Sequence, residues 1–261
     1  MDLSAWTERQ LILFVLVFMR NLGLLIGAPF FQSRNIPHTL RVSLALFLAL
    51  LLVPLLAAAG TMPLTFWQVA FQMGQELLLG IMMGYILYLT IAGIQLAGQI
   101  IEVPMGFGMV NVLDPQTGGQ MPIIGQLYQI VAVWLFLLVR GDHLLVKVLT
   151  QSFKLLPVGQ PLALMRGVPL VLRTFANLFI LAVQIAIPIV GVLFLTNVGL
   201  GVLAKLIPQI NVFFLGFPLK VFLGILLLIL SLPVFTRWVA ELFSANGRVW
   251  TELLRFLQAL G

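Results

Sequence analysis

Apolar stretches of about twenty residues, the length at which an α-helix crosses a bilayer, recur between residues 11 and 234. Hydrophobic residues make up 61% of the chain and charged residues 8%, against roughly a quarter charged in ordinary soluble domains. This composition excludes a soluble globule of this size. It predicts an all-α integral membrane protein with several passes.

Hydropathy divides the apolar sequence into about six hydrophobic helical segments. They are residues 11–31, 42–59, 66–101, 123–139, 170–200 and 212–234. Only the second and fourth have ordinary spanning length. A continuous helix over residues 66–103 would be about 57 Å long, against a hydrocarbon core of roughly 30 Å. The third segment is therefore expected to kink, tilt or protrude.

Polar side chains form two clusters on this third segment. The first cluster contains Gln68, Gln72 and Gln75, and the second contains Gln95, Gln99 and Glu102. Each cluster follows one helical face, but the two faces point to nearly opposite sides of a straight helix. The pattern therefore predicts two different neighbours for one helix.

Small residues also repeat at four-residue spacing on the third segment. Gly80 and Gly84 form one pair, and Gly93 and Ala97 form another. Such spacing lets a second backbone approach closely. The neighbour could belong to a partner chain or to the same helical bundle.

Residues 104–122 form the main interruption of the apolar pattern. Prolines bracket this stretch, and it contains four glycines, at positions 106, 108, 118 and 119. Its first half is apolar rather than hydrophilic, with Met105, Phe107, Met109 and Val110. Composition alone favours an external loop, since irregular backbone inside a membrane must be covered by protein or line a polar cavity.

Three further segments complete the pattern. Residues 144–156 are amphipathic but short, which favours an interfacial or re-entrant position. Pro208, Gln209 and Asn211 separate two apolar runs and predict a broken helix or a hairpin tip. After Pro233, charged residues among apolar positions predict an amphipathic surface helix.

The residue types exclude most catalytic chemistry. The chain has no cysteine, and its two histidines, His38 and His143, lack metal-ligand spacing. The nucleophile-elbow and Walker A motifs do not occur in the sequence, and its basic residues are scattered singly. We therefore expect no enzyme activity, no metal, no cofactor and no nucleic-acid partner.

Three acids could act within the membrane region, Glu76, Glu102 and Asp114, and Arg20 is a basic candidate in the first segment. An ionisable group at membrane depth is costly, so each is a candidate for proton transfer. No second acid stands one helical turn away to pass a proton on. That absence favours a segment end or a wet loop for Glu102 and Asp114. For Arg20 and Glu76 it favours interfacial positions or pairing with partner chains.

Short motifs occur in a fixed order along nearly the whole chain. They are Ala97-Gly98-Gln99, Met105-Gly106-Phe107, Asp114-Pro115, Met121-Pro122, Gly141 to His143, Ser152-Phe153, Leu156-Pro157, residues 208–213 and Gly216-Phe217-Pro218-Leu219. In this order the set resembles the FliR/SpaR/SctT family of type III secretion export-gate proteins.

The resemblance implies a component of the flagellar export gate in the bacterial inner membrane, at the flagellar basal body. In that family one such chain joins FliP-like and FliQ-like chains in a closed pore for unfolded polypeptides, with a FlhB-like protein packed outside. The assembly is a helical cone raised out of the membrane plane, which would explain the overlong helix. Residues 1–163 would be the FliP-like helical portion, and residues 164–261 a FliQ-like helical hairpin with an amphipathic tail.

The resemblance also implies roles for individual residues. It places the Gly-rich loop 104–122 inside the pore as a plug, which reverses the preference for an external loop. The plug and gate residues would be Met105, Gly106, Phe107, Gly108, Met109, Val110, Asp114 and Pro115. Contacts with partner helices would come from Gln95, Gln99, Glu102, Pro208, Gln209, Asn211, Gly216 and Pro218. Family members often carry Glu at position 99, so a carboxylate role is not carried over to Gln99.

Two alternatives remain at the level of sequence. Injectisome homologues, which serve virulence secretion, share much of the pattern. A stand-alone ion-coupled transporter would use broken helices around Pro104 and Pro208, with Glu102 or Asp114 as the proton carrier. An intramembrane enzyme ranks below both because no nucleophile–base pair is visible.

Overall fold

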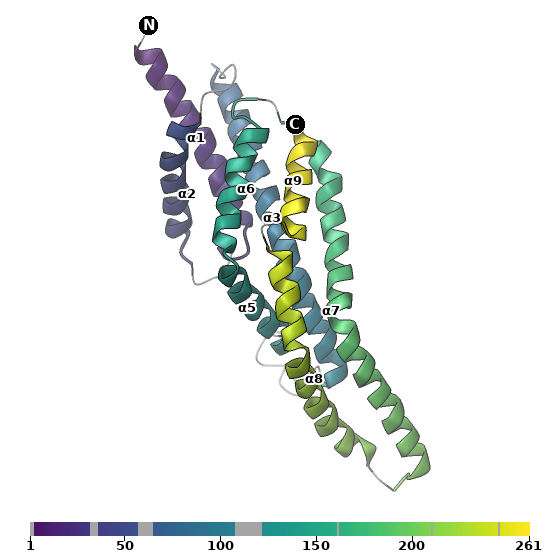
Figure 1. Cartoon of the computed structure of the whole chain (residues 1–261). Helices are drawn as coiled ribbons and strands as arrows, with labels where there is room; N and C mark the ends of the chain where they lie inside the picture. Colours follow the sequence, from purple (N-terminus) through teal and green to yellow (C-terminus); the bar gives the residue numbers. More distant parts are fainter. Residues whose placement is uncertain are drawn as a thin grey trace. The chain divides into compact units, whose positions relative to one another are not determined.

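The computed structural model describes residues 3–31, 36–56, 65–107, 122–160, 162–209, 211–244 and 246–261. These residues form helices joined by turns, with no strand among them, so the prediction of an all-α membrane protein is confirmed. The helices are α1 (Leu3–Gly27), α2 (His38–Leu52), the 3-10 turn η1 (Val53–Leu55), α3 (Phe66–Met105), α5 (Ile123–Leu138), α6 (Gly141–Leu155), α7 (Leu164–Leu206), α8 (Val212–Leu242) and α9 (Arg248–Leu260) (Figure 1).

Within the described ranges, five helical segments are long and apolar enough to cross a membrane: α1, α2 with η1, α3, α7 and α8. The bent pair of α5 and α6 forms a sixth if its 70° bend lies within one broken span. Helices therefore occupy each of the six predicted segments over the residues that the structure describes. With 40 residues, α3 extends over about 60 Å at 1.5 Å per residue, well beyond a bilayer core.

The structure agrees with the sequence-based prediction at the tip between α7 and α8 and differs from it at Pro233. Helices α7 and α8 run antiparallel and join through residues 207–211, which confirms the hairpin tip (Figure 1). Helix α8 continues past Pro233 to Leu242, so Pro233 does not mark the start of a surface helix. Apolar helices of membrane proteins tolerate an internal proline, because other groups satisfy the freed backbone.

The amphipathic surface helix of the tail is α9. Its apolar face is buried through Val249, Leu253, Phe256, Leu257 and Leu260. Beside it, the Lys147 ammonium of α6 lies 4.1 Å from the centroid of the Trp250 ring. This cation–π contact joins a basic residue of α6 to the half-buried Trp250 of α9.

The chain forms two compact units. The first contains Met1–Thr90, Arg140–Phe175 and Leu242–Gly261, and the second contains Ile91–Val139 and Ala176–Glu241. The long helices α3 and α7 contribute to both units. The division between residues 163 and 164, which rests on likeness to two other chains, stays a prediction.

In the first unit, α1 and α3 touch backbone to backbone through glycines. A Cβ atom on Gly27 would lie 2.9 Å from the Cα atom of Gly84, and one on Gly80 would lie 2.9 Å from the Cα atom of Gly23. Side chains at these positions would force the two helices apart. The predicted close approach at Gly80 and Gly84 is confirmed, and its neighbour is a helix of the same chain.

A buried ion pair lies beside this glycine contact. The guanidinium of Arg20 on α1 holds the Glu76 carboxylate of α3 through two bonds, at 2.5 and 2.9 Å. It also donates to the Leu156 carbonyl at 3.0 Å and to the Ser152 hydroxyl at 3.3 Å. Arg20 is fully buried and Glu76 is 2% exposed, so these residues pair with one another and not with a partner chain. The arginine thereby links α1, α3 and the end of α6.

The first polar cluster of α3 holds the connection that follows α6. The Gln72 amide donates to the Gly159 carbonyl at 2.9 Å, and the Gln75 amide donates to the Leu162 carbonyl at 3.5 Å. These bonds satisfy carbonyl groups of a segment without regular structure. The neighbour of the first cluster is therefore the turn between α6 and α7.

The buried pair predicts a large cost for removing one charge. Glu76→Leu leaves the buried guanidinium unpaired and should lower the free energy of unfolding by about 3–5 kcal/mol. The double variant Arg20→Met/Glu76→Leu removes both charges and should recover most of that loss. Denaturant unfolding of the purified chain measures both, with Glu8→Leu on the exposed part of α1 as the control. Equal stability of Glu76→Leu and the wild type would contradict the assignment.

Candidate functional site

The candidate site lies in the second unit, where α3 ends and α5 begins. These two helix ends are the stems of the Gly-rich loop. Five of the predicted plug residues, Gly108, Met109, Val110, Asp114 and Pro115, lie outside the described residues. The stems themselves are described in full and define how the loop is attached.

Glu102 connects the two stems. Its carboxylate, on a side chain of a residue that is 7% exposed, accepts a hydrogen bond from the Ile124 backbone N–H at 3.1 Å. Ile124 belongs to the first turn of α5, whose N-cap residue, Pro122, provides no side-chain cap. A carboxylate at this position satisfies a backbone N–H that has no partner within the helix, and the partial positive charge of the helix N-terminus stabilises it. Glu102, predicted to touch a partner helix, thus caps a helix of its own chain.

Glycines allow the stems to meet closely below this cap. A Cβ atom on Gly98 would lie 2.6 Å from both the Gly125 Cα atom and the Ile124 carbonyl oxygen. One on Gly125 would lie 2.9 Å from the Gln99 Cγ atom and 3.1 Å from the Gln95 carbonyl. The second polar cluster of α3 therefore faces α5. Together with the first cluster, it confirms two different neighbours for one helix.

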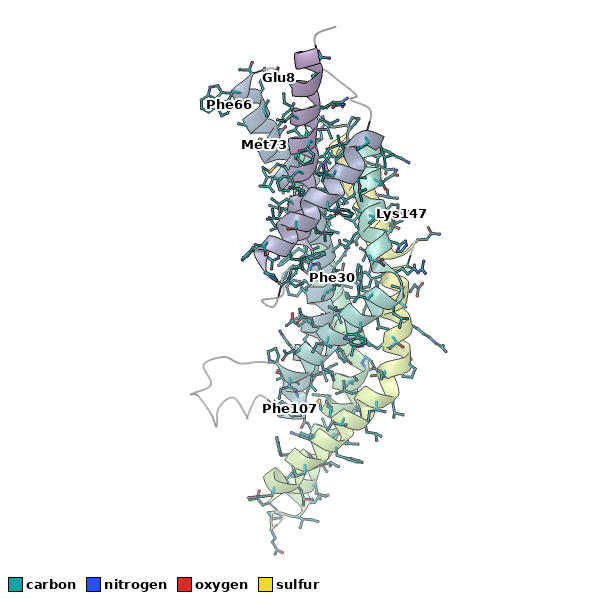
Figure 2. All side chains as sticks on the ribbon, turned by 90° about the vertical axis from the view of Figure 1, so that its left-hand side faces the viewer. Glu8, Phe30, Phe66, Met73, Phe107 and Lys147 are labelled. Atoms are coloured by element: carbon teal, nitrogen blue, oxygen red, sulfur yellow. The ribbon has the colours of Figure 1, made fainter. Side chains whose placement is uncertain are left out.

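Met105 and Gly106 fix the point at which α3 ends. Met105 is fully buried, and its side chain packs against Gly224 of α8. Gly106 follows with φ = 95°, a left-handed conformation that favours glycine, and its N–H donates to the Val103 carbonyl at 3.1 Å. Phe107 is half-buried and is the last described residue of the loop's first half (Figure 2).

The predicted residues of the hairpin lie in two environments. Pro208, Gln209 and Asn211 are exposed at its tip, and Pro218 is exposed on the first turns of α8. Gly216 is buried, and a Cβ atom there would meet the Leu200 side chain of α7 at 3.1 Å. The structure thus separates the exposed tip from Gly216, which serves the packing of α7 on α8.

Two contacts of this unit had no clear signal in the sequence. Gly224 leaves room for the Met105 side chain, but a single glycine in an apolar run does not identify its neighbour. Tyr128 of α5 stacks on Phe235 of α8 with ring centroids 4.5 Å apart. Both contacts join α8 to the stems of the loop.

The arrangement at the stems attaches the loop to α3, α5 and α8. In the part of the chain that the structure describes, no three His, Cys, Asp or Glu side chains gather into a potential metal site. The one carboxylate at the stems is engaged by a backbone N–H. A cap, a glycine contact and a buried methionine together hold both ends of a Gly-rich loop on apolar helices.

Comparisons with known proteins identify a family for the chain. The family described as Bacterial export proteins, family 1, matches residues 11–245. The chain is 34% identical to the flagellar biosynthetic protein FliR of Bacillus subtilis (strain 168), over 92% of this chain and 94% of that protein. It is 32% identical to FliR of Aquifex aeolicus (strain VF5), over 95% and 96% of the two chains. It is 30% identical to FliR of Pectobacterium carotovorum subsp. carotovorum, over 99% and 97%.

These matches define the class as that of the bacterial export proteins. The chain belongs to this family of FliR-like proteins, and the resemblance seen in its ordered motifs is confirmed.

The cap predicts different outcomes for two substitutions of Glu102. Glu102→Leu removes the acceptor and should destabilise the first turn of α5 by about 1 kcal/mol. Glu102→Gln keeps a carbonyl acceptor, so the backbone N–H groups at the start of α5 should retain most of their protection from hydrogen exchange. Hydrogen–deuterium exchange at the start of α5 measures the difference, with α7 as an internal control. If exchange in Glu102→Gln were as fast as in Glu102→Leu, the capping role would be contradicted.

Proposed function

We propose that the chain is a component of the flagellar type III protein export gate. The observation that carries the proposal is the family match over residues 11–245, which includes the stems, the Gly-rich loop and the hairpin. The relatives compared above are named as flagellar biosynthetic proteins, which supports flagellar over injectisome export. The activity is gating for unfolded flagellar subunits, with no bond made or broken by this chain.

The stems suggest how such a gate is built. Glu102 and Met105 anchor the loop, because one caps α5 and the other is buried against α8. Phe107 and the following Met109 and Val110 then supply the apolar seal. An apolar constriction resists ions because it is hard to wet, and flexible thioethers adapt to many passing sequences. In this proposal Met105 holds the base of the plug and the residues beyond it face the lumen.

Glycine gives the loop its freedom to move. Gly106 already has a left-handed φ of 95° at the end of α3. Gly108, one residue past Phe107, adds a second position without a side chain. Rotation at these two positions would let the seal swing aside without a side-chain clash, while Glu102 keeps the stems together. The proposal includes Asp114 and Pro115 in the plug.

The surface of the second unit supports a role inside a larger assembly. Large apolar side chains are exposed along α7 and α8, including Phe194, Leu195, Phe214, Phe222 and Leu230. In the membrane they would face lipid or the FliP-like and FliQ-like chains of the bacterial inner membrane gate, with a FlhB-like protein outside. The exposed Pro208, Gln209, Asn211 and Pro218 would contact these partner helices, and Gln95 and Gln99 would add polar contacts.

The start of α7 at Leu164 supports the proposed division of the chain into two portions. Residues 1–163 would be the FliP-like helical portion, and residues 164–261 the FliQ-like hairpin. Helices α3 and α7 contain 40 and 43 residues, longer than a flat bilayer requires. A cone at the flagellar basal body that rises out of the membrane plane would accommodate this length.

The gate is tested by small-solute permeability of cells that contain the complete export apparatus. Replacing Phe107, Met109 and Val110 by serine keeps the length of the loop and removes its apolar surface. We expect a leak of small solutes at matched abundance of the complex. Met105→Leu, which preserves a buried apolar anchor, is the control and should keep the membrane tight. A tight membrane in the triple serine variant would overturn the plug.

A further inference from the structure

A cavity of about 620 Å³ lies within the second unit, between the end of α3 and the facing parts of α7 and α8. Most of its wall is apolar, with Val103 from α3, Leu200 from α7 and Phe217 from α8. Two polar side chains also line it, Asn197 and Lys220. No acidic residue is among the described residues that form the wall. The cavity thus combines a long apolar lining with one positive charge.

Lys220 is half-buried in this wall. Within the ranges that the structure describes, its ammonium group makes no ion pair and no hydrogen bond. A lysine on an apolar helix at membrane depth is costly unless an anion or the interface accommodates its charge. Among the described residues no anion faces this lysine, and the cavity offers room for one.

Asn197 adds a neutral hydrogen-bonding group from the facing helix. Its amide can donate to an anion that the ammonium of Lys220 attracts. Gly201, one turn further along α7, also lines the cavity, and a Cβ atom there would meet nothing within 4 Å. The apolar space therefore extends to the backbone of α7. A ligand that fits would have an anionic head and an apolar chain.

We propose that this cavity binds an anionic phospholipid. The phosphate lies against Lys220 and Asn197, and one acyl chain follows the wall formed by Val103, Leu200 and Phe217. Basic pockets between apolar helices bind anionic headgroups because the charge is neutralised and the chain remains in an apolar surrounding. Since the cavity adjoins Gly106, such a lipid would stabilise the end of α3 from which the loop departs. The proposal needs only that the chain lies in a membrane and does not depend on the gate.

Native mass spectrometry of the purified full-length chain, supplied with phosphatidylglycerol or phosphatidylcholine, tests the site. Lys220→Gln removes the charge, and Gly201→Leu adds a side chain to the apolar space at a position where a Cβ atom meets nothing within 4 Å. The matched controls are Lys205→Gln, an exposed lysine in the last turn of α7, and Gly199→Leu, where a Cβ atom also meets nothing within 4 Å. Neither control residue lines the cavity.

We expect the wild type and both controls to retain phosphatidylglycerol in preference to phosphatidylcholine. Retention should fall about fivefold in Lys220→Gln, the effect of one basic residue near a lipid phosphate. It should fall in Gly201→Leu as well, with the charge intact. Equal retention of phosphatidylglycerol in all five proteins would overturn the proposal, because the lipid would then bind elsewhere on the chain. Equal retention of the two lipids by the wild type would overturn it too.

Discussion

Close backbone contact at glycines is the constraint on which the structure depends. Helix α3 meets α1 at Gly80 and Gly84, α7 at Gly93 and α5 at Gly98. In a bilayer, lipid tails are as apolar as the helix faces, so helices associate through tight packing and hydrogen bonds and not through burial alone. Each contact fixes the rotation of α3 about its axis. The rotation in turn determines which polar side chains can reach a partner.

Polar groups on α3 find their partners because of that rotation. Gln72 reaches a carbonyl after α6, Glu76 meets the arginine of α1, and Glu102 caps α5. An unsatisfied polar group is expensive where water is absent, so these bonds select one arrangement of the helices. The same principle applies at the stems of the loop.

Much of this organisation was predictable from residue spacing. Hydropathy located the six apolar segments, the glycine pairs indicated close helix contacts, and the two polar clusters indicated two neighbours for α3. The identities of the neighbours were not predictable. Arg20 and Glu76 are 56 positions apart, and nothing in the sequence around either residue identifies the other as its partner. Met105 was expected in the loop, but its place against Gly224 follows from three-dimensional packing of α3 on α8. Pro233 had suggested a helix end, since a sequence does not tell how an apolar surrounding satisfies the broken backbone bond.

Site-specific cross-linking tests most directly whether the segment that follows Met105 faces the exported polypeptide. The chain contains no cysteine, so Phe107→Cys and Phe194→Cys each introduce a single thiol. Phe194 is 63% exposed on α7 and serves as the matched position outside the stems. With an export substrate arrested in the assembled apparatus, the thiol at position 107 should cross-link to the substrate and the thiol at 194 should not. Normal export with no cross-link at position 107, or with equal cross-linking at both positions, would contradict a plug that lines the export path.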